Sequence, residues 1–262
     1  MSRKASRNLI NRHHQLEKQH RRAIDSGNED AAVTLKSELE SLGGLRSYQA
    51  ASLQGQSHER GGDTSRVLLE WIPTEKLRNH RERLRLLEVG ALSTQNACST
   101  SDVFDVVHID LNSQEPGIEQ QDFMQRPLPL DEDEKFHIIS LSLVLNYVPD
   151  AADRGRMLQR TLSFLYDINT VNVTVATDIT PALFMVLPRS CTTNSRYLTN
   201  SRLLELMVRL GYTQLRAKAT QKLSYSLWKK AGKPLNDCIE FPKKEVNPGS
   251  RRNNFTITLR KP

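Results

Sequence analysis

The chain contains few cysteines and no long apolar run. Cys98, Cys191 and Cys238 are the only cysteines among 262 residues, and their wide spacing fits neither a disulfide framework nor a thiolate zinc site. The longest apolar run, residues 138–145, is far too short to span a bilayer, and the charged amino terminus has no apolar segment behind it. We therefore expect a soluble intracellular protein without a membrane partner.

The sequence also lacks a metal-binding signature. Its seven histidines are scattered, and the adjacent pair His13 and His14 would point to different faces of a helix. Surface or packing roles suit these side chains better than ligation. We expect no bound metal.

Positive charge is concentrated at the two ends of the chain. The net charge is +7, yet residues 1–24 contain seven Lys and Arg against one Glu, and residues 229–262 contain nine against three acids. The rest of the chain is acidic, with 21 cations against 26 anions. Basic arms of this kind occur in proteins that bind nucleic acid, although solvated basic tails occur in others. Charge alone favours a polyanionic partner only slightly.

Two helices are expected at the start of the chain. Leu9, Leu16 and Ala23 recur at intervals of seven, and apolar residues from Ala31 to Leu42 recur at threes and fours. A polar turn separates the two sets. This pattern predicts a helical hairpin.

A polar segment divides the hairpin from a second domain. Residues 47–65 bear several glycines and show no sustained periodicity, so they read as a loop or linker. We expect residues 1–63 to form the basic helical hairpin with its connecting loop. Residues 64–262 then form the main domain, with a long basic insert at 231–253.

Apolar strands alternating with helical patterns predict an α/β fold with a mostly parallel sheet and helices on both faces. The expected strands are 84–89, 103–109, 136–142, 181–187, 221–228 and 254–260, and the expected helices lie near 151–166 and 199–210. The last two strands follow one another without a helix, so we expect them to pair antiparallel. The sheet should therefore be mixed at its far end.

The first expected strand ends in one glycine, where a dinucleotide-binding turn has two or three. Ala91 and Leu92 follow Gly90, although a pyrophosphate at a helix amino terminus would need more glycine. Asp110 directly follows the second strand, twenty residues after Gly90, the spacing at which a doubly wound sheet offers a carboxylate to ribose hydroxyls. A ligand with a ribose but no phosphate, such as S-adenosylmethionine, fits this pattern. The alternative is that Gly90 only ends a strand and Asp110 only caps a loop.

Two further segments place candidate ligand-binding residues after strands. Asp122 could bind an adenine amino group, and Phe123 could stack on the adenine ring. Asn146 and Tyr147 follow the apolar run at the end where ligands bind in open parallel sheets. The alternative for Asn146 is a turn-forming role ahead of Pro149.

Several stretches together resemble the fungal 25S ribosomal RNA adenine-N1 methyltransferase family. They are SRNLINRHHQLEK, SYQAASLQGQSHERGGDTSRVLLEWI, LRLLEVGAL, HIDLNS, QQDFMQRPLP, ISLSLVLNYVP and LFMVLPRSCTTNSRYL, and they run from about residue 3 to residue 228. LEVGAL alone is generic to class I methyltransferases. The resemblance implies a seven-stranded Rossmann-like sheet, S-adenosylmethionine as methyl donor, an adenine of large-subunit rRNA as target, and a nucleolar location in the nucleus.

The resemblance also implies roles for individual residues. Gly90 matches the glycine turn and Asp110 the ribose-binding acid, while Asp122 and Phe123 match the segment beside the cofactor's adenine. Asn146 and Tyr147 match the segment that faces the target base.

A second function comes from the same resemblance. The animal relatives resemble a sensor that binds S-adenosylmethionine and regulates the TOR pathway through protein contacts, so cofactor binding without catalysis is an alternative. The basic ends of the chain favour a modifier of large-subunit rRNA or of a pre-ribosomal particle, because a sensor has no need of phosphate affinity.

Overall fold

The computed structural model of the 262-residue chain describes residues 12, 15–16, 19–20, 22–24, 26–42, 63–113, 115–168, 176, 178–232 and 240–259. The chain divides into two compact units, Met1–Asp63 and Thr64–Pro262.

The smaller unit is helical in its described residues. All the described residues from 12 to 24 are helical, and α2 spans Glu29–Ser41. The Asn28 side chain caps α2 by accepting a hydrogen bond from the Ala31 amide at 3.1 Å, and Gly27 makes the turn with φ of 69°. Arg12 forms an ion pair with Glu38 across the hairpin. The predicted helical hairpin is therefore present.

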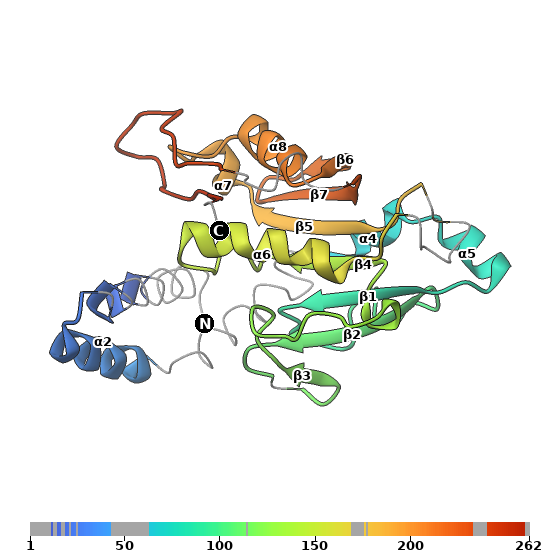
Figure 1. The fold of residues 1–262 in the computed structure, drawn as a ribbon, viewed down its shortest axis with the longest axis horizontal. Helices are drawn as coiled ribbons and strands as arrows, with labels where there is room; N and C mark the ends of the chain where they lie inside the picture. Colours follow the sequence, from blue (N-terminus) through green and yellow to red (C-terminus); the bar gives the residue numbers. More distant parts are fainter. Residues whose placement is uncertain are drawn as a thin grey trace. The chain divides into compact units, whose positions relative to one another are not determined.

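The larger unit is built on one seven-stranded sheet (Figure 1). Its elements in chain order are α4 (Ser65–Trp71), α5 (Thr74–His80), β1 (Leu84–Val89), β2 (Phe104–Asp110), β3 (Ile118–Gln120), the 3-10 helix η1 (Glu132–Glu134), β4 (Ile138–Ser142), α6 (Ala151–Phe164), β5 (Ala182–Pro188), α7 (Ser190–Thr193), α8 (Asn200–Arg209), β6 (Tyr212–Ala219) and β7 (Leu223–Lys230). The strand order is β3-β2-β1-β4-β5-β7-β6, and β7 pairs antiparallel with both β5 and β6. The remaining pairs are parallel, so the sheet is mixed as expected.

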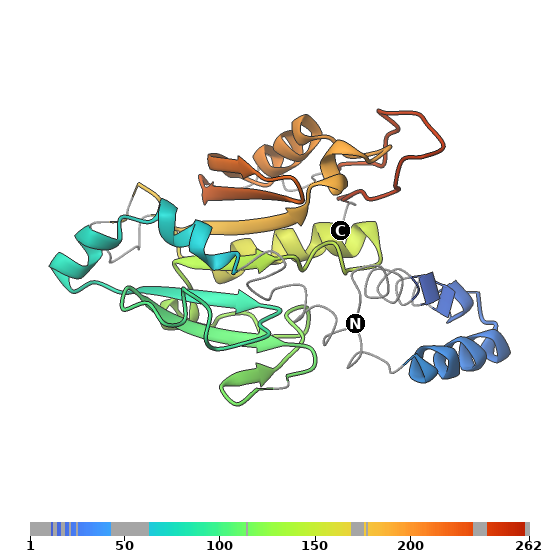
Figure 2. The ribbon, with the colours of Figure 1, turned by 180° about the vertical axis from the view of Figure 1, so that it is seen from behind.

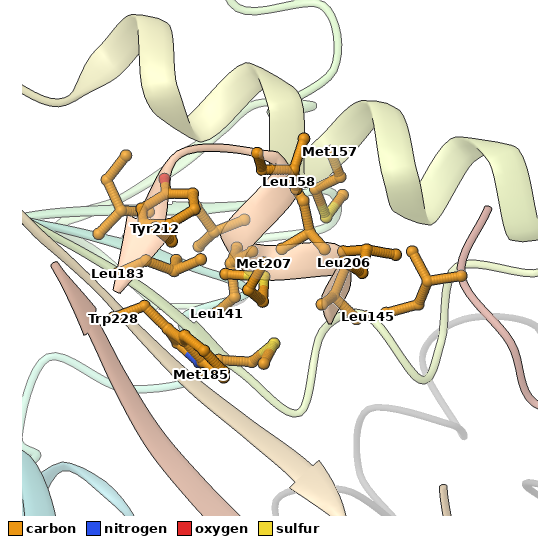
Figure 3. Packing of buried hydrophobic residues seen from close by; sticks show 14 of the residues in the cluster. Leu141, Leu145, Met157, Leu158, Leu183, Met185, Leu206, Met207, Tyr212 and Trp228 are labelled. Carbon is orange, nitrogen blue, oxygen red and sulfur yellow. The ribbon is translucent and has the colours of Figure 1, made fainter. Parts of the chain in front are cut away.

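Alternate residues of the strands pack on opposite faces of the sheet. Leu183 and Met185 of β5 join the core under α6 and α8, where Leu158, Leu206 and other buried side chains interdigitate (Figure 3). Phe184 points to the other face and packs edge-on against Trp71 of α4, with ring centroids 6.0 Å apart. Figure 2 shows α4 on this second face, away from α6. Burial on both faces explains why β4 and β5 are continuous apolar runs.

The antiparallel partner of β7 differs from the sequence prediction. We expected strand 221–228 to pair with 254–260, but it pairs with β6 at Tyr212–Ala219. β6 is an edge strand whose first residue alone is fully buried, so it lacks the apolar signal of an inner strand. The three-residue strand β3 also has no such signal.

The segment predicted as the last strand instead crosses α6. The Thr258 amide donates to the Ala151 oxygen at 2.9 Å, and Leu259 exchanges main-chain hydrogen bonds with Phe241. A Cβ on Gly155 would lie 2.0 Å from the Thr258 main-chain oxygen, so only glycine permits this crossing. Ile257 and Leu259 are buried against the core of the unit.

Candidate active site

The ends of β1 and β4 meet at Gly90. Its amide donates to the Ile109 oxygen of β2 at 2.8 Å, and its φ of 75° lies in the left-handed region. A Cβ at this position would lie 2.8 Å from Cγ2 of Val144. The turn therefore requires glycine for its conformation and for the close approach of the loop after β4.

Asp110 and Asp122 follow next along the same edge of the sheet. The Asp110 main-chain oxygen accepts from the Gln121 amide at 2.8 Å, which places Asp122 one residue beyond that contact. Each carboxylate is fixed by a local turn, since Asp110 Oδ1 accepts from the Asn112 amide and Asp122 Oδ1 from the Met124 amide, both at 2.8 Å. Gly90, Asp110 and Asp122 thus lie at the carboxyl ends of three adjacent strands.

The ring of Phe123 belongs to the core. Only 2% of the residue is exposed, and its ring lies 5.3 Å from that of Phe164 in α6. The Phe123 main-chain oxygen accepts from Arg160 Nε at 2.7 Å. The expected stacking of this ring on a ligand is therefore not the arrangement in the structure, because the ring already packs inside the protein.

The loop after β4 presents Asn146. Leu143 has a φ of 59°, unusual for a residue with a side chain, and Leu145 is fully buried in the core shown in Figure 3. The Tyr147 amide closes a turn on the Val144 oxygen at 2.9 Å. Oδ1 of Asn146 is buried and has no hydrogen-bond partner among the residues that the structure describes. A buried amide oxygen without a donor is costly, and such positions are where a ligand supplies the missing group.

Arg154 of α6 is hydrogen-bonded to the main chain of the loop after β4. Its Nε donates to the Leu145 oxygen at 3.1 Å and to the Val148 oxygen at 2.8 Å. Its Nη1 donates to the Thr256 oxygen at 2.6 Å, and its guanidinium lies 4.4 Å over the Phe255 ring. Desolvation by burial lowers the pKa of Arg154 to about 10, which leaves it charged at neutral pH.

Glu115 holds the chain that follows Gly90. Its Oε1 accepts from the amide of Thr94 at 3.0 Å and from the Thr94 hydroxyl at 2.6 Å. These hydrogen bonds lower the pKa of Glu115. Residues 90–103 join β1 to β2 through turns without a helix. No helix begins after Gly90 in this described stretch, so it lacks the helix amino terminus that binds a pyrophosphate in dinucleotide-binding turns.

A second polar network lies at the end of β1. Glu88 Oε2 accepts from Asn96 Nδ2 at 2.7 Å and lies 3.6 Å from His108 Nε2. His108 Nε2 is 2.7 Å from the Ser99 hydroxyl, and burial lowers the pKa of this histidine. This network fixes the loop between β1 and β2, and it lies on the face of the sheet away from α6.

The sequence reasoning missed Arg154, Glu115 and Leu143. Gly155 inside an otherwise regular helix was the available signal for the crossing of the C-terminal segment. Nothing in the sequence singled out Arg154 or the left-handed Leu143, because both depend on tertiary contacts.

The described residues contain neither a metal-binding cluster nor a membrane-spanning helix. No group of three or more His, Cys, Asp or Glu side chains among them is arranged to hold a metal ion. None of their helices has the length and apolar character needed to cross a bilayer.

Fold and site together define a class of protein. A sheet of order 3-2-1-4-5-7-6 with only the seventh strand reversed, with a glycine turn after β1 and polar side chains at the ends of β2, β3 and β4, is the arrangement of a class I methyltransferase. The chain belongs, within that class, to the 25S rRNA adenine-N1 methyltransferase family. A matching family model and two similar fungal proteins establish this membership and confirm the resemblance seen in the sequence.

The family model described as 25S rRNA (adenine(2142)-N(1))-methyltransferase, Bmt2, matches residues 33–257. A Schizosaccharomyces pombe protein named 25S rRNA adenine-N(1) methyltransferase is 38% identical over 95% of this chain and 89% of its own length. A Saccharomyces cerevisiae 25S rRNA (adenine(2142)-N(1))-methyltransferase is 39% identical over 86% of this chain and 63% of its own length. Among solved structures, the O-methyltransferase NcsB1 aligns with a TM-score of 0.47 at 14% identity, over 84% of this chain and 70% of that one.

Proposed function

We propose that this protein methylates N1 of an adenine in 25S rRNA, with S-adenosylmethionine as donor. Family membership supports the reaction, since both curated relatives are named for it. Neither relative is named as a sensor, so nothing favours the alternative of cofactor binding without catalysis.

The donor site in this proposal lies over β1, β2 and β3. S-adenosylmethionine supplies a methyl group bound to a positively charged sulfur. Gly90 allows the main chain to approach the ligand closely, and Asp110 accepts hydrogen bonds from the ribose hydroxyls. Asp122 accepts from the adenine amino group of the donor, because a carboxylate keeps lone pairs beyond the one that the Met124 amide uses. Phe123 contributes through its main chain, since its ring is buried.

The target-base site in this proposal rests on Oδ1 of Asn146, which is buried and has no hydrogen-bond partner within the described part of the chain. Adenine has a donating amino group next to N1, so an amide oxygen that accepts from this group also orients N1. Tyr147, the next residue, stacks on the base in this proposal. In this proposal Asn146 and Tyr147 position the target base, and neither acts as a general base.

Adenine N1 has a free lone pair and needs no general base. The rate then depends on alignment of N1 with the methyl group, which fixed hydrogen bonds can supply. N1 lies on the Watson–Crick edge, so the target must be unpaired or extruded from a helix before it reaches Asn146.

The same proposal assigns roles to the two parts of the chain. Residues 64–262 form the methyltransferase domain, and residues 1–63 together with the insert at 231–253 supply positive charge for pre-ribosomal RNA. The protein acts in the nucleolus, where large-subunit rRNA is made.

Incubation of the purified protein with S-adenosylmethionine and an unmodified 25S rRNA fragment tests this function. Mass analysis of the nucleosides should show 1-methyladenosine, and primer extension should stop at one position, because the methyl group blocks the pairing edge. Binding of S-adenosylmethionine without methylation of free rRNA or of pre-ribosomal particles would favour the sensor instead.

A further inference from the structure

Five cations lie together beyond the carboxyl end of β5. The Arg189 amide donates to the Lys222 oxygen at 2.7 Å, which joins the end of β5 to the turn between β6 and β7. Asn253 Nδ2 donates to the Ser190 oxygen at 2.8 Å, and this bond brings the C-terminal loop to the same place. We call the five cations, Arg189, Arg196, Lys222, Arg251 and Arg252, the basic arc.

A shallow, open hollow of about 480 Å³ lies at Arg189 and Lys222, two of the five cations of the basic arc. It is lined by Arg189, Ser190, Thr193, Gln221 and Lys222, which are two cations and three neutral polar residues with no acid among them. Nη1 of Arg189 donates to the Thr220 oxygen at 3.3 Å. That bond uses one of the five N–H groups of the guanidinium and orients it. The remaining N–H groups can donate hydrogen bonds to the oxygens of a phosphate.

The five cations of the basic arc form no ion pair with an acidic side chain among the described residues. Arg196 instead donates to the Gly249 oxygen and to Asn254 Oδ1. Seven cations elsewhere in the unit do form ion pairs with carboxylates, namely Arg78, Arg126, Lys135, Arg156, Arg209, Lys218 and Lys230. Positive charge without a carboxylate partner attracts an external anion more strongly than charge already paired.

A short series of contacts connects the basic arc to the loop that bears Asn146. The Ser195 hydroxyl donates to the Phe255 oxygen, and Arg154 bonds both the next carbonyl, that of Thr256, and the carbonyl of Leu145. Leu143 and Val186 are hydrogen-bonded at the ends of β4 and β5, so both strands deliver their loops to one edge of the sheet. In Figure 1, α7 and the C-terminal loop lie at the opposite end of the sheet from α5.

We propose that the basic arc binds phosphates of the rRNA strand next to the target adenine. This inference rests on the proposed function, because it takes the base at Asn146 to be part of an RNA. Several cations spaced along one edge match the regular charges of a nucleic-acid backbone, and hydroxyl and amide groups between them match phosphate oxygens. RNA fits this surface better than an acidic protein, since the edge continues to the site where a base must enter.

The double variant Arg189→Ala with Lys222→Ala tests this surface. Both residues are exposed, so their removal should leave the fold intact. The matched control removes two exposed cations at the other end of the sheet, Lys76 and Arg83, by the same substitutions. The probe is a 25S rRNA fragment that contains the target adenine, titrated at several salt concentrations, with S-adenosylmethionine affinity measured in parallel.

We expect the double variant to bind the fragment on the order of tenfold more weakly, with the slope of log K against log salt reduced by about 1.4, or about 0.7 for each lost phosphate contact. S-adenosylmethionine affinity and the control variant should match the wild type. Wild-type RNA affinity and salt slope in the double variant would overturn the proposal and would favour an acidic protein as the partner of the arc. An equal loss of RNA affinity in the control variant would also overturn it. If the wild type never methylates the fragment but binds it through the arc, the proposed function fails while this surface stands.

Discussion

Arg154 in α6 is hydrogen-bonded to the main-chain oxygen of Leu145, the residue before Asn146, over 3.1 Å. The same guanidinium also bonds Val148 and Thr256, so one buried side chain joins the target-base loop to the C-terminal segment. Its planar array of donors allows this, whereas a lysine has a single charged nitrogen. Arg154 is therefore a positioning residue for the loop.

Substitution of Arg154 should impair methylation more than donor binding. Arg154→Lys leaves buried carbonyls without donors, at a cost of about 1–3 kcal/mol each, so we expect a lower unfolding free energy and a displaced loop. Single-turnover methylation, donor titration and thermal unfolding measure the three effects. Arg156→Lys on the same helix is the control, because Arg156 is exposed and pairs with Asp153. Equal losses of donor affinity and methylation rate would show that Arg154 supports the whole site and not the loop alone.

Gly90→Ala should abolish or strongly weaken donor binding. The added Cβ meets Val144 at 2.8 Å in a backbone conformation that costs an L-residue roughly 1–2 kcal/mol. Gly27→Ala is a matched control, since Gly27 has a φ of 69° with no atom within 4 Å of the added Cβ. We expect both variants to lose stability but only Gly90→Ala to lose affinity in calorimetry. Full affinity in Gly90→Ala would place the donor elsewhere.

Asp110→Ala should weaken S-adenosylmethionine binding by roughly ten- to a hundredfold, because hydrogen bonds to a charged acceptor contribute about 1.5–3 kcal/mol. Asp105, exposed nearer the start of the same strand, provides the control variant Asp105→Ala. Isothermal calorimetry should show a loss in the first variant and none in the second. The ribose assignment is wrong if both bind like the wild type.

His137 should make the protein less stable in mild acid. Burial, with repulsion from Arg85, lowers the pKa of His137 from its ordinary 6.5 to about 4. As pH falls from 6.5 towards 4 the unfolded chain takes up a proton that the folded chain does not, so the unfolding free energy decreases by roughly 3 kcal/mol in total. Denaturant titrations across this range measure the decrease. His137→Asn keeps an acceptor for the Arg85 amide, as Nδ1 does at 2.9 Å, and should flatten the profile, whereas an unchanged profile would assign it to other groups.

The inner strands could be predicted from the sequence because they are buried on both faces. β4 and β5 are largely apolar runs for this reason, β1 has buried apolar residues at most positions, and the residues that follow the strands mark the edge where ligands bind. The edge strand β6 gave no such pattern, since most of its residues are exposed. Residues 254–260 alternate in sequence like a strand, but the described part of this segment, residues 254–259, crosses α6 where Gly155 leaves room for it.

The positions of the candidate site residues followed from strand ends, but the directions of their side chains did not. An aromatic residue after a strand reads the same whether it faces a ligand or the core, and Phe123 faces the core. The burial of Asn146 Oδ1 is likewise a tertiary feature, because it depends on how the loop after β4 is folded and packed and not on the residues next to it in the sequence.

A single-turnover comparison of Asn146→Ala with the wild type, on a 25S rRNA fragment with donor binding titrated in parallel, tests the assignment of the active site most directly. Asn200→Ala, at an exposed asparagine that begins α8, is the matched control. We expect Asn146→Ala to methylate adenine N1 roughly ten- to a hundredfold more slowly, because the base loses the acceptor that aligns it, while S-adenosylmethionine affinity stays within about twofold of the wild type. A wild-type methylation rate in Asn146→Ala would contradict the target-base role, and loss of donor binding in this variant would move Asn146 to the donor site.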